Sequence, residues 1–233
     1  MNDRLKSLLM ILIFVFLASG LTLTVLSQIQ AYRDQQVYLA TQATLPVHRL
    51  PASSDRLYIN PVLGLSFRYP AILALSDTST SVELTHQVPF KNHGTCDMKG
   101  DTAVYDNLTD FRVSFKIAEG TVAQVVKQLS PYMPKENFAG ETLKLSPGFI
   151  DEYEAGNLKG FAIYEGVEGC GHTIYYFPIA SNRVLVVEQA MVQQLSGVLS
   201  SDVEKQVLAV PGVISREKNY EIFGKILKTV QFN

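Results

Sequence analysis

The sequence predicts an α+β protein in which an antiparallel β-sheet is flanked by helices and follows one N-terminal transmembrane helix. Three observations predict it: an uncharged N-terminal stretch, short apolar strands separated by tight turns, and three helical patterns among them. The 233 residues are 47% hydrophobic and 18% charged, as in a folded chain. The net charge is −2 and no basic stripe occurs, so we expect no nucleic-acid partner.

The N-terminal segment is predicted to anchor the chain in a membrane. Residues 8–26 carry no charge and come close to the ~20 residues that span a bilayer. A cleaved signal peptide that ends near residues 18–20 is the alternative. Basic residues ahead of the span favour a single-pass protein in the cell membrane with an extracytoplasmic C-terminal part. We expect an anchor and stalk helix over 1–40, a linker over 41–56, and an extracytoplasmic domain over 57–233.

The strands of this domain are predicted from apolar runs that end at turn residues. Asn60, Pro61 and Gly64 form a turn between residues 57–59 and the alternating run 65–69, which predicts a hairpin. Short spacing between the runs indicates antiparallel pairing in one sheet of about six to eight strands. The further strands are expected at residues 81–88, 111–117, 149–155, 161–166, 173–179 and 183–191.

Helices are expected to cover this sheet. Residues 174–177 and 184–187 are apolar at consecutive positions, which is typical of strands buried on both faces. A first helix is predicted over 122–129 after a Thr121 cap, and a second begins at a capping box formed by Ser201 and Glu204. The last helix is expected over roughly 217–229.

The two ends of the domain suggest a family. Tyr58 with the run 64–70 (Gly-Leu-Ser-Phe-Arg-Tyr-Pro), and the closing run 223–232, resemble the opening hairpin and the last helix of PsbP-like proteins. That family takes its name from an extrinsic subunit of photosystem II. The resemblance implies an antiparallel sheet sandwiched between helices, as in the membrane-anchored PsbP-like domains of bacteria. It implies no functional residue.

Two loops, 93–97 and 169–172, contain both cysteines of the chain. In an oxidising compartment two cysteines are expected to pair, and the neighbouring glycines would let the backbones approach each other. We therefore favour a disulfide between Cys96 and Cys170. Asp97 and Glu168 lie in or beside the same loops and are candidates for ligand binding.

The same loops allow two other interpretations. His93, Cys96, Cys170 and His172 have the side chains of a zinc site, although their spacing is tighter than in most zinc loops. Alternatively, one thiol is a nucleophile beside a histidine, with Arg112 holding an oxyanion. We favour the disulfide over both of these interpretations.

Four aspartates precede the predicted strand 111–117. They lack the order of a calcium-binding loop, so we expect solvated turn or cap residues. They are Asp97, Asp101, Asp106 and Asp110.

The function predicted from the sequence is a membrane-anchored extracytoplasmic binding or assembly module without a cofactor, whose partner is a protein or a small molecule. The alternative is an extracytoplasmic hydrolase or transpeptidase that uses the cysteine and histidine cluster.

Overall fold

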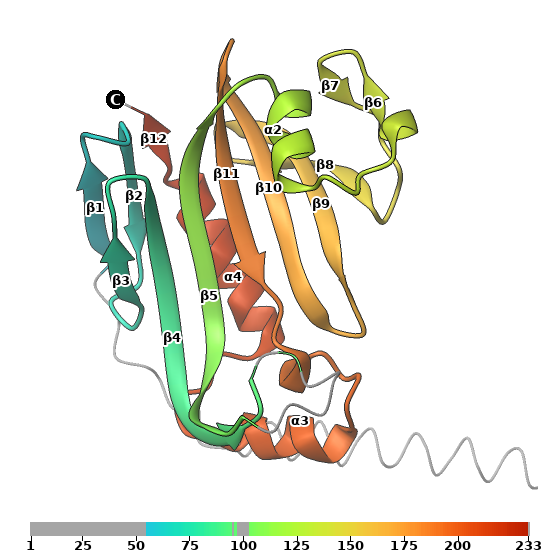
Figure 1. Cartoon of the computed structure of the whole chain (residues 1–233). Coiled ribbons are helices and arrows are strands. Elements are labelled where there is room, and N and C mark those ends of the chain that lie inside the picture. Colours follow the sequence, from blue (N-terminus) through green and yellow to red (C-terminus); the bar gives the residue numbers. More distant parts are fainter. Residues whose placement is uncertain (1–54, 95, 97–102, 233) are drawn as a thin grey trace, which may run out of the picture. The chain divides into compact units, whose positions relative to one another are not determined.

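The computed structural model describes residues 55–94, 96 and 103–232 (Figure 1). They belong to one compact unit, residues 50–233. The predicted anchor and stalk and nearly all of the predicted linker lie outside the described residues. Within the described part, no helix has the length and apolar character needed to cross a bilayer.

A seven-stranded antiparallel sheet forms the centre of the domain (Figure 1). Its strand order is β3-β4-β5-β11-β10-β9-β8, so chain neighbours pair everywhere except between β5 and β11. These strands are β3 (Ala74–Asp77), β4 (Ser81–Asn92), β5 (Tyr105–Glu119), β8 (Ile150–Ala155), β9 (Leu158–Val167), β10 (Cys170–Ala180) and β11 (Arg183–Ala190). The consecutive apolar residues of β10 and β11 are buried on both faces, as their pattern predicts.

A three-stranded sheet joins the two ends of the domain. The predicted hairpin is confirmed as β1 (Arg56–Asn60) paired with β2 (Leu65–Tyr69). The Asn60 side chain accepts hydrogen bonds from the backbone N–H groups of Val62 and Leu63, both at 2.9 Å, and so fixes the turn. The C-terminal strand β12 (Gln231–Phe232) pairs with the other edge of β2.

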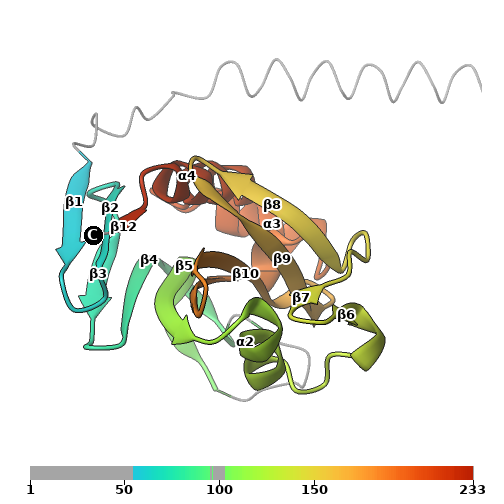
Figure 2. The same ribbon diagram turned by 90° about the horizontal axis from the view of Figure 1, so that it is seen from above.

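The two faces of the large sheet have different covers (Figure 2). On one face, α4 (Arg216–Lys228) and the small sheet bury a core that includes Phe67, Phe115, Phe177 and Phe223. On the other face, the cover consists of α2 (Val122–Leu129), η1 (Lys135–Asn137) and the two-residue strands β6 (Phe138–Ala139) and β7 (Thr142–Leu143). A smaller core lies under η2 (Gln193–Leu195) and α3 (Ser201–Leu208).

The predicted helix-flanked α-β-α sandwich is wrong. In the described residues strands account for 49% and helices for 20%, and only three α-helices occur. One face shares its cover between α4 and the small sheet, and the other has a helix of eight residues plus a loop with short strands. Consecutive apolar residues show that a strand is buried on both faces, but they do not identify the cover, which any apolar surface can supply.

The helices begin close to their predicted starts. The first one is α2, and Thr121 caps it in a reciprocal capping box with Gln124. The Ser201 cap is wrong by one residue, because the Ser200 hydroxyl accepts the hydrogen bond from the Val203 N–H group at 3.2 Å. The last helix, α4, begins after the cap residue Ser215.

Candidate functional site

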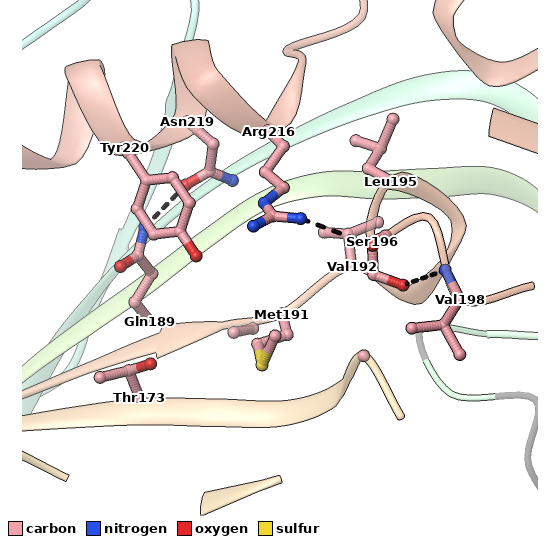
Figure 3. A pocket seen from close by; sticks show the side chains of 12 residues that line it. Thr173, Gln189, Met191, Val192, Leu195, Ser196, Val198, Arg216, Asn219 and Tyr220 are labelled. Carbon is pink, nitrogen blue, oxygen red and sulfur yellow. Dashed lines mark hydrogen bonds between the residues drawn. The ribbon is translucent and has the colours of Figure 1, made fainter. Parts of the chain in front are cut away.

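A cavity of about 180 Å³ lies between the end of β11, the η2 segment and the first turn of α4 (Figure 3). We call it the β11–α4 pocket. It is lined by Gly169, Thr173, Gln189, Ala190, Met191, Val192, Leu195, Ser196, Val198, Arg216, Asn219 and Tyr220.

Helical periodicity brings three of these side chains together. Ser215 caps α4 by accepting a hydrogen bond from the Lys218 N–H group at 3.3 Å, so Arg216 is the first helical residue. Residues three and four positions later lie on the same side of a helix, which puts Asn219 and Tyr220 beside Arg216. The first turn of α4 thereby forms one wall of the pocket (Figure 3).

The floor of the pocket is a buried chain of amide hydrogen bonds. Gln189 is 4% exposed, and its Nε2 donates to Asn219 Oδ1 at 2.8 Å (Figure 3). Tyr175 Oη donates to Gln189 Oε1 at 3.1 Å, and Asn219 Nδ2 donates to the Asp110 carbonyl at 2.9 Å. Burial raises the pKa of Tyr175, so its hydroxyl stays a donor. The floor therefore has a fixed arrangement of donors and acceptors.

Below this floor lies a completely buried carboxylate. The side chain of Asp110 is 0% exposed; Oδ1 lies 2.7 Å from His86 Nδ1, and Oδ2 accepts the Ile214 N–H at 2.7 Å. These bonds tie β4, β5 and the segment before α4 to one another. The expectation that Asp110 is a solvated turn residue is wrong, because it lies within β5 and has partners distant in the sequence.

The mouth of the pocket carries one charged side chain. Arg216 is exposed, and its Nη1 donates a long hydrogen bond of 3.4 Å to the Ser196 carbonyl (Figure 3). Within the described part of the chain no carboxylate forms an ion pair with it. Gly169 lies against Ser196: a Cβ at this position would lie 2.2 Å from Ser196 Oγ, and the Gly169 φ of +77° is one that side chains rarely adopt.

The two cysteine loops meet next to this pocket. Cys96 and Cys170 lie 2.6 Å apart, which is longer than the S–S bond of about 2.05 Å, so the structure contains no disulfide between them. Two successive glutamines of η2 hold the loops in place. Gln193 Nε2 donates to the Glu168 carbonyl at 3.1 Å, and Gln194 Nε2 donates to the Gly94 carbonyl at 2.6 Å.

The other predicted site residues are dispersed. His93 Nδ1 lies 3.0 Å from the Ala103 carbonyl, and His172 lies between Glu165 and Glu188. Over residues 55–94, 96 and 103–232, no group of three or more His, Cys, Asp or Glu side chains is arranged to hold a metal. Asp97 lies outside the described residues.

The binding and catalytic candidates in and near these loops have structural contacts. Glu168 is exposed in the turn between β9 and β10, with a left-handed φ of 51°. Arg112, proposed to hold an oxyanion, donates from Nε to Glu83 Oε2 at 2.8 Å. The hydrolase or transpeptidase alternative thus gains no support from these contacts.

Comparison with models of protein families and with curated proteins found no match to this chain. The PsbP-like resemblance therefore rests on the two terminal motifs alone and stays a prediction.

The sequence contained a signal for part of the pocket floor. Gln189 lies on the same face of β11 as Leu185 and Val187. Asn219 lies on the same buried side of α4 as Ile222 and Phe223. A polar residue at a buried position indicates an internal hydrogen bond. Nothing in the local sequence marked Arg216.

Proposed function

We propose that the domain is an extracytoplasmic binding module whose β11–α4 pocket takes a small ligand with a carboxylate and a short apolar part. The observation that carries this proposal is Arg216, the charged residue at the mouth, which has no carboxylate partner among the described residues. A guanidinium group matches a carboxylate with two parallel hydrogen bonds.

The remainder of the lining suits such a ligand. Thr173 and Tyr220 offer hydroxyl groups, and the floor offers amide groups of fixed orientation. The apolar part would pack against Met191, Val192 and Leu195. The volume of about 180 Å³ slightly exceeds the ~150 Å³ of an engineered cavity that holds benzene, which limits the ligand to the size of a small amino acid derivative or aromatic acid.

The location is part of the same proposal. The uncharged residues 8–26 support a membrane anchor, and the basic residues before them support an extracytoplasmic domain. A binding domain tethered in this way would meet small solutes outside the cytoplasm.

The test compares an acid with its neutral counterpart. The full-length chain in detergent is titrated with N-acetylleucine and with N-acetylleucinamide, and binding is followed by saturation-transfer NMR. We expect the acid to bind and the amide to bind roughly tenfold more weakly, as charge-assisted hydrogen bonds imply. Replacing Arg216→Gln should weaken binding of the acid by about the same factor.

A matched variant controls for net charge. Arg56→Gln removes an exposed guanidinium from β1 in the small sheet and should leave acid binding unchanged. Equal binding of acid and amide, or equal effects of the two substitutions, would refute the proposal.

A further inference from the structure

A second pocket lies on the opposite face of the sheet, between the segment after α2 and the strands β9 and β10. Figure 2 shows this segment on the face that α2 covers. The volume of the pocket is about 440 Å³. We call it the acidic aromatic pocket; the residues that line it include Tyr132, Met133, Phe149, Glu165 and His172.

Among the ion-paired carboxylates of the described residues, only Asp110 is more buried than Glu165. Its side chain is 9% exposed, whereas the carboxylates that pair with Lys or Arg in the described chain are between 31% and 83% exposed. Its partners are the hydroxyl of Ser130, the hydroxyl of Tyr132 at 3.1 Å and Nε2 of His172 at 3.5 Å. A largely buried carboxylate is thus held by neutral hydroxyl donors and one imidazole.

The local charge is unbalanced. His172 is shared with a second carboxylate, because its Nδ1 lies 3.3 Å from Glu188 Oε1. No Lys or Arg in the described residues forms an ion pair with Glu165 or Glu188. A positive charge on His172 would be divided between Glu165, which lines the pocket, and the more exposed Glu188 outside it, so the described residues supply Glu165 with no cation of its own.

The walls are suited to supply the rest of a cation site. The Tyr132 residue is 75% exposed, and its hydroxyl is directed to Glu165, whose negative charge raises the pKa of that hydroxyl and keeps it a donor. The Tyr164 N–H donates to the Phe149 carbonyl at 3.1 Å, which holds Phe149 beside β9, where its ring packs on the same side of the sheet as Ile163. Cations bind the faces of aromatic rings, and a nearby carboxylate strengthens the attraction.

From these contacts we propose that the acidic aromatic pocket binds a small organic ammonium ion, methylated at nitrogen. Both oxygens of Glu165 already have protein partners, Ser130 on Oε1 and Tyr132 with His172 on Oε2. A ligand that needs to donate hydrogen bonds would compete with them. A trimethylammonium group donates none and gains its binding energy from ring faces and from the uncompensated negative charge.

The experiment separates charge from shape. The full-length chain in amine-free buffer is titrated with choline and with the neutral isostere in which a tert-butyl group replaces the trimethylammonium group. We expect choline to bind about tenfold more tightly than the isostere. Glu165→Gln should reduce choline binding to the level of the isostere and leave the isostere unaffected.

Two further variants complete the test. Glu154→Gln removes a negative charge from the neighbouring strand β8, where the Glu154 carboxylate pairs with Lys159 of β9. This control should change the affinity for neither choline nor the isostere. Tyr132→Ala removes an exposed ring, which the fold does not need, and should weaken choline binding about tenfold. Equal binding of choline and isostere, or unchanged choline binding in a folded Glu165→Gln protein, overturns the proposal. If Glu165→Gln does not fold, unchanged choline binding by Tyr132→Ala overturns it.

Discussion

Replacing the buried carboxylate of Asp110 should be among the most damaging single changes in this domain. Asp110→Ala removes the acceptor of two hydrogen bonds, both 2.7 Å long. The Ile214 N–H is buried and would lose its partner, at a cost of about 1–3 kcal/mol. The His86 side chain is 17% exposed and can form a hydrogen bond with water instead. Loss of its bond to Asp110 therefore adds only about 1 kcal/mol. With the space left by the carboxylate, we expect a total of about 3–5 kcal/mol.

Two related substitutions define a ranking. Asp110→Asn keeps one acceptor oxygen, but its NH2 group would face one of the two N–H donors, that of His86 or that of Ile214. This substitution should cost about 2–3 kcal/mol. His86→Ala leaves the bond from Ile214 intact and should cost about 1–2 kcal/mol. The double replacement of Asp110 and His86 by Ala should cost less than the sum of the two single costs, because both remove the same contact.

The assay is urea-induced unfolding of the full-length chain. Near-ultraviolet circular dichroism suits this assay, because the signal of the 11 Tyr residues reports on side-chain packing and the chain has no Trp to dominate it. The slope of the free energy of unfolding against urea concentration should stay constant, while the urea concentration at the midpoint falls. A loss below about 1 kcal/mol for Asp110→Ala, or a larger loss for His86→Ala, would contradict the reasoning.

Three further predictions concern the core, alkaline pH and the cysteines. Phe223→Ala should cost about 3–5 kcal/mol in the same assay, because this ring of α4 is 1% exposed and packs against Tyr175 of the sheet; an unchanged midpoint would mean that α4 is not docked. Burial raises the pKa of Tyr175 above its ordinary 10.0, so its contribution to stability holds below pH 10.0 and is lost as the pH rises beyond it. Exposed tyrosines such as Tyr105 and Tyr220 ionise without unfolding, so tyrosinate absorbance should rise in two steps, the second together with unfolding. Ionisation of all the tyrosines before unfolding would argue against a buried Tyr175 hydroxyl. Exposure to a small disulfide should join Cys96 to Cys170, since only a short movement separates the sulfurs; mass spectrometry that finds both thiols alkylated without reduction would contradict this.

Local signals made the helices and hairpins predictable. The start of α2 is fixed by the Thr121 cap, its buried face by apolar spacing, and its end by the approaching Pro131. The β1–β2 turn depends on Asn60 and its near neighbours. Each of these features is determined by residues that are close together in the sequence.

The features that the sequence did not predict depend on distant partners. β5 pairs with β11, far away along the chain, and no local pattern encodes that choice. Asp110 has the residue type of a loop, but its environment is set by His86 and Ile214, which come from other parts of the sequence. The β11–α4 pocket likewise depends on where α4 docks, so Arg216 gave no signal before the fold was known.

The pairing of β12 with β2 has a consequence for the timing of folding. Ser66 of the first hairpin lies opposite Gln231, and the Thr229 hydroxyl accepts a hydrogen bond from the Arg68 N–H at 2.9 Å. During synthesis one edge of β2 therefore stays unpaired until residues 231 and 232 have been added. Contacts between such distant residues form slowly, so a growing chain exposes this edge to other chains until β12 has been made and has paired. Deletion of residues 231 and 232 would leave every other strand present and one edge of the first hairpin permanently unpaired.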